Sequence, residues 1–426
     1  MSEKQKEVAY GIDDIETLSF KEGVRQKISM YLGSADMQGV YGAIQEIISN
    51  SIDEYYMGSG KKIEIELGLD TTTKEQFIIV TDNGRGVPFG KKADGTNVLI
   101  DIFTKPHTGG KFSDKAYRSV AGLNGIGAKA TCLSSSIFDV SVVRDGIQAK
   151  AGWKKGIIYK YEESPTTIKT SGTSIRFSLD KEVYNLEPIN IKFEELCSRC
   201  KTLSYLTKGL TFILREGSKR VEYCAKNGLM DLIENNVKDP IHSKPFYCEM
   251  EEDGIKVEIA MQWTKNREKS FVFTNGLEQT EGGTSLTGVK TAITTFMKKK
   301  FKEGLDGDMA RTGLVYAVSC TVPNPSFANQ TKTKINNPEL RGLCQRATGK
   351  MLTDFEAKQS TEFTKITEFL SKEKKAEIAA QRARRQVLDA TKDIEKNQKK
   401  KVFNSDKLKD AEYLGPDSIL LLVEGD

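Results

Sequence analysis

Apolar positions in the first half of the chain repeat with two different periods. Between residues 41 and 57 they recur every three or four residues, which indicates one face of a helix. Segments 61–69 and 76–81 instead alternate or run continuously apolar, which favours strands. Further strands are expected at 137–143, 157–161, 173–179 and 210–215, and a helix at 192–206. These elements predict a mixed α+β domain over residues 21–228, preceded by an arm at 1–20 that carries few apolar residues.

The pattern changes after residue 228. Strands are expected at 255–262, 269–274 and 313–322, with one helix near 286–302 and a long, charged, alanine-rich helical stretch at 353–400. We therefore expect a second α/β domain over residues 229–402. Residues 403–426 are expected to be a linker followed by a strand, because Ile419 to Val423 are five consecutive aliphatic residues. Such a strand needs sheet neighbours, so we expect it to begin a further domain.

The charge distribution adds information only near the C-terminal end of the chain. The formal net charge is +5, and the segment from Lys372 to Lys401 alone carries eleven basic and five acidic residues. The basic excess of the whole chain therefore lies in one stretch. This stripe fits contact with a polyanion such as DNA, and it fits a solvated helix face about equally well.

The scarcity of histidine narrows the possible chemistry. The chain has two histidines, His107 and His242, so a Ser–His or Cys–His hydrolase is disfavoured and a carboxylate is the better candidate for a general base. The seven cysteines show no framework spacing, and the lone C-x-x-C of Cys197 and Cys200 is interpreted as reduced thiols in an intracellular protein. No apolar run is long enough to span a bilayer, and the N-terminus lacks the pattern of a signal peptide.

Three polar residues share one face of the predicted helix at 41–57. Glu46, Asn50 and Asp53 stand at positions i, i+4 and i+7. An isolated face of this kind is more often solvated surface. With suitable neighbours, the asparagine oxygen could bind Mg²⁺ and the glutamate could polarise a water for attack on a γ-phosphate.

Two glycine-containing segments supply such neighbours. A buried strand ends at Asp82, followed by Gly84 and Gly86, where a carboxylate could accept a hydrogen bond from an exocyclic amine such as that of adenine; the alternative is a simple Asn-Gly turn. Gly122, Gly125 and Gly127 lead into a helix expected near residue 128, and backbone N–H groups at a helix start bind phosphate. A second flexible segment, HTGGKF, could close as a lid.

The ordered motifs E-x-x-x-N-x-x-D, D-x-G-x-G and G-x-x-G-x-G, followed by Gly172 and Thr173, resemble those of the GHKL ATPases. This resemblance implies a GHKL (Bergerat) α/β sandwich that binds ATP with Mg²⁺. The superfamily includes type II topoisomerases, heat-shock ATPase chaperones, mismatch-repair ATPases and histidine kinases.

Later segments favour the type II topoisomerase branch. FANQTKTKI at 327–335 resembles the Q-T-K loop of the topoisomerase transducer domain, which implies that Gln330 and Lys332 reach the γ-phosphate. EGGTS at 281–285 and VPNPSF at 322–327 are similar to the gyrase B transducer, which has a ribosomal-S5-like fold with a long C-terminal helix. LLLVEGD is similar to the start of a TOPRIM domain, where Glu424 would bind Mg²⁺.

The resemblance also implies a set of site residues. Glu46 would be the general base, assisted by Gln330 and Lys332, and Asn50 would hold Mg²⁺. Asp82 and Thr173 would hold adenine, Tyr10 would reach the nucleotide of a partner protomer, and Pro88, with Arg85 and Arg144, would form the pocket rim. The remaining residues expected to contact the nucleotide are Asp53, Gly84, Gly86, Gly109, Lys111, Tyr117, Gly122, Leu123, Asn124, Gly125, Ile126 and Gly127.

Some residues depart from the bacterial pattern. RQKIS at 25–29 stands where bacterial enzymes have arginine-proline-glycine, Ser49 replaces an aspartate, and Asn124 replaces a histidine. The branch therefore stays open between gyrase, topoisomerase IV and a phage or plasmid enzyme.

We expect an ATPase clamp that dimerises on binding ATP, acts on DNA together with a DNA-cleaving subunit or domain, has no membrane association, and works in the cytoplasm of a bacterium or a phage-infected cell. The alternative is a GHKL chaperone or a mismatch-repair clamp. A histidine kinase is disfavoured, because His107 lies inside the glycine-rich segment and not on a preceding dimerisation helix.

Overall fold

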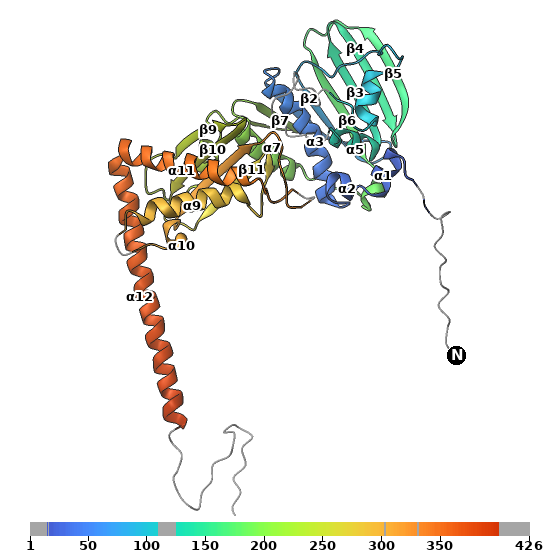
Figure 1. Ribbon diagram of the computed structural model, residues 1–426. Coiled ribbons are helices and arrows are strands. Elements are labelled where there is room, and N and C mark those ends of the chain that lie inside the picture. Colours follow the sequence, from blue (N-terminus) through green and yellow to red (C-terminus); the bar gives the residue numbers. More distant parts are fainter. Residues whose placement is uncertain (1–14, 16, 110–124, 302–303, 330–331, 400–426) are drawn as a thin grey trace, which may run out of the picture. The chain divides into compact units, whose positions relative to one another are not determined.

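A computed structural model describes residues 15, 17–109, 125–301, 304–329 and 332–399 of the chain (Figure 1). Contacts divide the chain into two compact units, residues 1–366 and residues 367–426. The first unit contains two mixed sheets, each covered by helices. This arrangement confirms the predicted fold class of a GHKL α/β sandwich followed by a transducer-type α/β domain.

The first sheet has eight strands in the order β5-β4-β3-β6-β2-β1-β7-β8. All neighbouring pairs are antiparallel except β1 and β7, which run parallel. The strands are β1 (Lys62–Leu69), β2 (Gln76–Asp82), β3 (Ser135–Arg144), β4 (Ile147–Lys154), β5 (Ile157–Pro165), β6 (Gly172–Leu179), β7 (Thr211–Glu216) and β8 (Lys219–Tyr223). The helices of this part are α1 (Phe20–Gln26), α2 (Ser29–Leu32), α3 (Met37–Tyr56), α4 (Val98–Thr104), α5 (Gly127–Leu133), α6 (Lys181–Tyr184) and α7 (Phe193–Leu206).

Helix α3 forms the centre of the first core. Its N-cap residue Asp36 accepts a hydrogen bond from the backbone N–H of Gln38, which satisfies one of the donors left open at a helix start. Its isoleucine stripe is buried, with Ile44 and Ile47 each 1% exposed. The buried residues of β1 include Ile63, also 1% exposed, in the same core, so α3 is held against the sheet with its polar face turned elsewhere.

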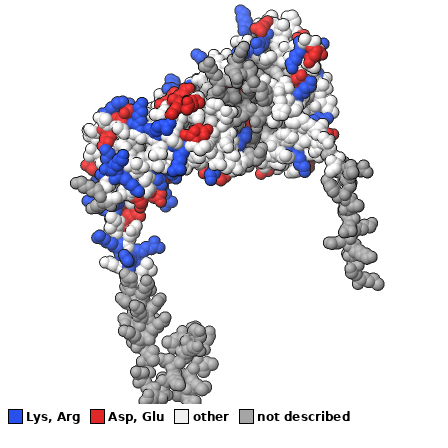
Figure 2. All heavy atoms as spheres, viewed as in Figure 1, with Lys and Arg blue, Asp and Glu red and all other residues white. Residues whose placement is uncertain are grey.

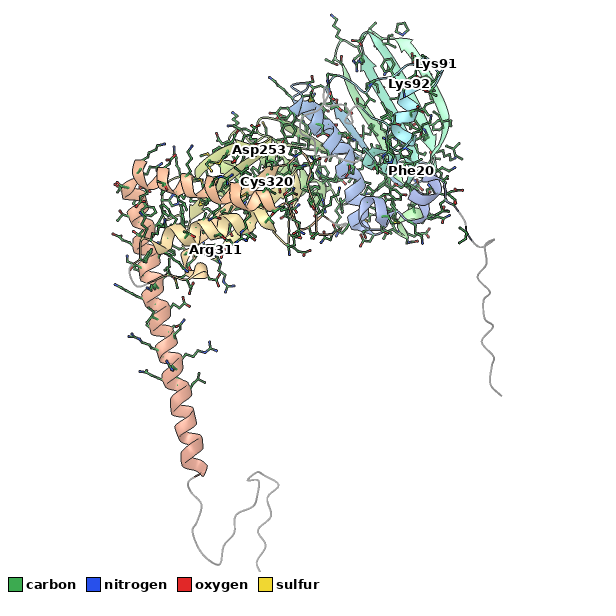
Figure 3. All side chains as sticks on the ribbon, viewed as in Figure 1. Phe20, Lys91, Lys92, Asp253, Arg311 and Cys320 are labelled. Atoms are coloured by element: carbon green, nitrogen blue, oxygen red, sulfur yellow. The ribbon has the colours of Figure 1, made fainter. Side chains whose placement is uncertain are left out.

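The second sheet has five strands in the order β12-β11-β13-β10-β9. Its strands are β9 (Phe246–Glu252), β10 (Ile255–Trp263), β11 (Lys269–Thr274), β12 (Leu277–Glu278) and β13 (Leu314–Thr321). The accompanying helices are α8 (Leu229–Asn236), α9 (Thr284–Lys298), α10 (Gly307–Ala310), α11 (Pro338–Lys358) and α12 (Ser360–Lys399). Cys320 lies in this sheet, and Asp253 lies at the turn between β9 and β10 (Figure 3).

The helical stretch predicted at 353–400 is two helices in the structure. Helix α11 ends at Lys358, and the next residue, Gln359, leaves the helical region with φ −135° and ψ 50°. Helix α12 then runs for 40 residues. The predicted helical stretch is therefore interrupted at residue 359, and a long C-terminal helix is confirmed.

None of the helices in the described ranges is long and apolar enough to cross a membrane. The predicted domain limits, the N-terminal arm and the strand at 419–423 stay predictions. Residues 1–14 and 16 of the arm and the whole of that strand lie outside the described residues.

Candidate functional site: a cavity lined by both domains

A cavity of about 1030 Å³ in the first unit collects most of the predicted site residues. From the first domain these are Glu46, Asn50, Asp82, Gly86, Pro88, Gly109, Gly125, Ile126, Gly127 and Thr173, and from the second domain Lys332. Residues separated by nearly three hundred positions in the sequence therefore line one space. Its volume suits a ligand of nucleotide size.

Asp82 is positioned by three hydrogen bonds at the end of β2. Its carboxylate accepts from Ser51 Oγ at 3.0 Å, from the Gly84 N–H at 2.9 Å and from the Thr173 N–H at 3.3 Å. Burial raises the pKa of this carboxyl above its usual range, and the three hydrogen bonds oppose that rise because they favour the anion. The result is a fixed hydrogen-bond acceptor in the cavity wall.

Glycines beside Asp82 let two backbone segments approach closely. Gly86 has φ +80°, and a β-carbon there would lie 2.8 Å from the Val143 carbonyl oxygen. Thr173 Oγ1 accepts a hydrogen bond of 3.2 Å from the N–H of Val87, which ties this turn to β6. Asp82 and Thr173 are thereby held next to each other, as the sequence predicts.

Glu46 lies against the first residue of helix α5. A β-carbon at Gly127 would lie 1.9 Å from Glu46 Oε2, so any other residue there would displace this carboxylate from its position. Asn50 follows one helical turn later on α3 and lines the same cavity. The helical spacing read from the sequence thus brings an acidic group and an amide to the glycine-rich side of the cavity.

Lys129 is a site residue that the sequence reasoning missed. Although a lysine, it is only 3% exposed, and its ammonium donates to the carbonyl oxygens of Thr108 at 2.7 Å and Gly125 at 2.6 Å. These two residues flank the segment 110–124 on either side. The sequence offered one sign that Lys129 belongs to the site, namely its position one residue after the predicted helix start at 128.

A paired cation and anion form part of the cavity rim. Arg85 donates to Glu54 through Nε at 2.9 Å and through Nη2 at 2.8 Å, a bidentate pair between the turn after β2 and helix α3. Arg144 donates to the Gly86 carbonyl oxygen at 3.3 Å. Arg85, Pro88 and Arg144, which were predicted as rim residues, all line the cavity, and so does Glu54, which was not predicted.

Lys332 stands in a hairpin of the second domain. Phe327 pairs with Ile335 across it, and Ile335 also bridges to Gly283, the N-cap of α9. Thr333 Oγ1 donates to Glu281 Oε1 at 2.5 Å, and Asn329 Oδ1 accepts from the Thr333 N–H at 3.0 Å. These contacts hold a lysine with φ +57° so that it lines the cavity.

Two predicted residues do not line the cavity. Asp53, the third member of the Glu46–Asn50–Asp53 face, is 1% exposed and is buried inside the domain without lining the cavity. Gly84 contributes only indirectly, through its hydrogen bond to Asp82. The predicted residues Tyr10, Lys111, Tyr117, Gly122, Leu123, Asn124, Gln330 and Glu424 lie outside the described residues.

One residue of the cavity, Asn50, is a candidate ligand for Mg²⁺. Among the described residues no group of three or more His, Cys, Asp or Glu side chains is arranged to hold a metal ion. The Asn50 oxygen fits a Mg²⁺ ion that takes its other ligands from phosphate oxygens and water, as this ion commonly does.

Two family sequence models match the chain. Residues 35–183 match the family described as histidine kinase-, DNA gyrase B-, and HSP90-like ATPase, and residues 228–386 match the family described as DNA gyrase B. The DNA gyrase B protein of Myxococcus xanthus is 31% identical over 98% of this chain and 52% of its own length. The DNA gyrase B protein of Haloferax volcanii is 32% identical over 98% of this chain and 66% of its own length. The chain thus spans about half to two thirds of the curated relatives it matches.

Solved structures of similar fold include the 43K ATPase domain of Thermus thermophilus gyrase B in complex with an aminocoumarin. That structure covers 86% of this chain and 97% of its own, with a TM-score of 0.70 and 24% identity. The ATPase region of Saccharomyces cerevisiae topoisomerase II has a TM-score of 0.64 and 16% identity, and covers 84% of this chain and 99% of its own. At these identities the likeness concerns the fold alone. The match over residues 228–386 gives no support to the chaperone or mismatch-repair alternative.

Proposed function

This chain belongs to the DNA gyrase B family of GHKL ATPases, and from that membership we propose that it is the ATP-binding and ATP-hydrolysing clamp of a type II DNA topoisomerase. The observation that carries the proposal is the shared cavity. Glu46, Asp82 and Lys332 come from two domains and line one space of about 1030 Å³. An ATP molecule placed there would be a ligand of both domains at once.

The adenine end of the site is assigned to Asp82 and Thr173. Asp82 is already fixed by Ser51, Gly84 and Thr173, so its carboxylate is oriented before the ligand arrives. A buried, preoriented acceptor favours a base with an exocyclic amine, because a base without that donor would leave the carboxylate unpaired.

The hydrolytic end is assigned to Glu46. Its carboxylate accepts a proton from the water that attacks the γ-phosphorus, and the bond to the bridging oxygen of ADP breaks. Lys332 pairs with the negative charge of the γ-phosphate from the side of the second domain. Mg²⁺, when bound by Asn50, supplies charge neutralisation to the phosphates.

The other predicted contacts complete this proposal. Lys111, Tyr117 and residues 122–127 surround the phosphates and ribose, Gln330 accompanies Lys332, and Tyr10 reaches the nucleotide of a second copy. Glu424 is proposed as a Mg²⁺ ligand for DNA cleavage.

We propose DNA as the macromolecular substrate. ATP binding closes a homodimer around a DNA segment, and hydrolysis reopens it. The net charge of +6 between Lys372 and Lys401 supports contact with the phosphate backbone. DNA cleavage is assigned to a separate DNA-cleaving subunit or domain. The enzyme is proposed to act in the cytoplasm of a bacterium or a phage-infected cell.

The test is Glu46→Gln, measured by nucleotide binding and by phosphate release. We expect ATP binding to stay within about threefold of wild type, while turnover falls by roughly 10² to 10⁴. Glu66→Gln, an exposed glutamate on β1, is the matched control and should leave both unchanged. Turnover retained in Glu46→Gln contradicts the assigned base. ATPase activity that DNA and a cleaving partner fail to stimulate contradicts the topoisomerase role.

A further inference from the structure

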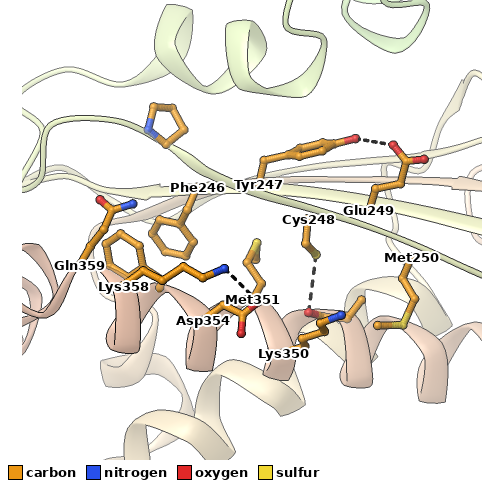
Figure 4. A pocket seen from close by; sticks show the side chains of 13 residues that line it. Phe246, Tyr247, Cys248, Glu249, Met250, Lys350, Met351, Asp354, Lys358 and Gln359 are labelled. Atoms are coloured by element: carbon orange, nitrogen blue, oxygen red, sulfur yellow. Dashed lines mark hydrogen bonds and ion pairs between the residues drawn. The ribbon is translucent and has the colours of Figure 1, made fainter.

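A second cavity, of about 430 Å³, lies between strand β9 and helix α11 in the second domain (Figure 4). None of its lining residues belongs to the larger cavity. Strand β9 is an edge of the five-stranded sheet, so this space sits where the sheet ends and the helix continues. The proposed ATPase chemistry makes no use of it.

The floor of the cavity is aromatic and sulfur-rich. Phe246, Cys248 and Met250 alternate along β9 and point toward α11, which contributes Met351 and Phe355 to the lining (Figure 4). Cys248 Sγ lies 3.5 Å from the Ala347 carbonyl oxygen of that helix. The rings of Phe246 and Phe355 stack with centroids 4.1 Å apart and an interplanar angle of 15°. Thioether and thiol sulfur atoms make favourable contacts with ring edges, so this floor suits an aromatic ligand better than a purely aliphatic one.

The acidic groups near β9 are already engaged. Glu249 accepts a hydrogen bond of 3.0 Å from the Tyr247 hydroxyl and forms an ion pair of 3.1 Å with Lys256. The same hydroxyl lies 2.6 Å from Glu258. At the β9–β10 turn, Glu252 is also engaged, because it forms an ion pair of 2.5 Å with Arg346 of α11. Figure 2 shows that acidic and basic side chains both gather on the surface of the first unit.

The helix side of the rim is cationic. Lys350, Asp354 and Lys358 follow one another at intervals of four residues on α11, so two ammonium groups face one carboxylate. Asp354 and Lys358 are 3.8 Å apart, a loose and solvent-exposed pair. Lys350 is exposed and has no ion-pair partner in the described part of the chain. The rim therefore offers one uncompensated positive charge above an apolar floor.

We propose that this cavity binds a small aromatic anion, with its ring on the Phe246–Phe355 floor and its carboxylate, sulfonate or phosphate group at Lys350. The volume is within the range of small-molecule sites and admits one or two fused rings. A neutral apolar molecule would fill the floor without using Lys350.

The probe is 1-anilinonaphthalene-8-sulfonate, whose fluorescence rises in apolar surroundings. Titrations are made with the larger cavity saturated by a non-hydrolysable ATP analogue, so that the two sites are separated. We expect Lys350→Glu to weaken binding at least about tenfold, because a hydrogen bond to a charged group is lost and a repulsion is added. Arg341→Glu changes the charge of the same helix at an exposed position outside the cavity and should alter binding less than about twofold.

Two further arms complete the test. Cys248→Phe fills the floor and should abolish the fluorescence change while the thermal midpoint shows that the protein is folded. N-phenyl-1-naphthylamine has the same rings without the sulfonate, and it should bind at least about tenfold more weakly and respond to neither charge reversal. Equal weakening by Lys350→Glu and Arg341→Glu, equal binding of the neutral probe, or unchanged binding in Cys248→Phe would each overturn the proposal. None of these outcomes bears on the ATPase assignment.

Discussion

The Ser51 hydroxyl donates a hydrogen bond of 3.0 Å to Asp82, and this bond joins helix α3 to the end of strand β2 at the cavity wall. Ser51 is 7% exposed, so water does not readily replace it as a donor. The bond favours the ionised form of a carboxyl whose pKa burial has raised.

Ser51→Ala should therefore weaken ATP binding by about five- to tenfold at neutral pH, since one hydrogen bond to a charged acceptor is lost. Because the adenine amine needs the ionised carboxylate, affinity falls as the pH drops through the pKa of Asp82 in the folded protein. Removing Ser51 raises that pKa further, so the fall should begin at a higher pH. Calorimetric titration between pH 7.5 and 5 measures both effects. Ser49→Ala, a buried serine of the same helix that does not line the cavity, is the control.

Lys129→Met should lower ATP affinity at least about tenfold. The substitution keeps much of the side-chain volume but removes the hydrogen bonds that tie Thr108 and Gly125 to one ammonium group. The two ends of the 110–124 segment then lose their common anchor. Lys105→Met, on an exposed lysine paired with Asp101, serves as the reference. Equal affinities of the two variants would contradict an anchoring role.

Lys332→Ala should slow ATP hydrolysis strongly while changing ATP binding only slightly. The γ-phosphate loses a cation that the second domain supplies, so kcat should fall by roughly 10² to 10³ while the ATP dissociation constant changes by only a few-fold. Lys334 occupies the same hairpin, is exposed and does not line the cavity. Lys334→Ala should leave kcat unchanged, and a comparable loss in both variants would place the effect in the hairpin and not in the ammonium group.

We expect the second domain to lose stability in mild acid, because the neutral ring of His242 is buried in the folded protein. Its ring is neutral, because Nε2 accepts the Trp263 N–H at 3.0 Å while Nδ1 bonds the Lys244 carbonyl oxygen at 2.9 Å. Burial lowers its pKa from 6.5 to about 4. The unfolded chain therefore binds a proton more readily, and the stability that the neutral ring contributes is present above pH 6.5 and is lost as pH falls from 6.5 toward 4.

The loss should approach about 3 kcal/mol at most across this window. Denaturant unfolding followed by Trp263 fluorescence measures it in a Trp153→Phe background, since the chain has two tryptophans. Adding His242→Gln should flatten the slope of unfolding free energy against pH between 6.5 and 4.5. An unchanged slope would assign the acid sensitivity to other groups.

Gly288→Ala should destabilise the second domain by about 1 to 3 kcal/mol, because its β-carbon would lie 2.3 Å from the Arg341 carbonyl oxygen. Gly349→Ala is the matched substitution in a helix, with nothing within 4 Å of the new methyl group, and should stabilise by about 0.5 to 1 kcal/mol. The two shifts in unfolding midpoint should have opposite signs. Two shifts of the same sign would contradict the close helix contact.

The periodic elements of the site could be predicted from the sequence. The helical period placed Glu46 and Asn50 on one face of α3, and the apolar run of β2 placed Asp82 at a strand end. Asp53 shows the limit of this reasoning, because it lies on the same side of α3 but a further turn along, where burial by neighbouring elements and not the helical period decides its surroundings.

Other parts depended on tertiary contacts. Lys129 is buried only because two carbonyl oxygens converge on its ammonium group, and the sequence carries no periodic sign of that convergence. Strand β4 was not predicted, since its alanines and glycine have low strand propensity and β3 and β5 hold it by pairing on both sides. The break at Gln359 was likewise missed, because the sequence around it contains neither proline nor glycine.

The contact of Gly288 with Arg341 brings helices α9 and α11 closer together than a methyl group at residue 288 would allow. Both helices adjoin the Lys332 hairpin: α9 begins at Gly283, which bridges to Ile335, and α11 begins three residues after Ile335. The Lys332 hairpin is thus attached at the starts of two helices whose spacing is set by a glycine, so a bulkier residue at position 288 would alter the support of a residue that lines the large cavity.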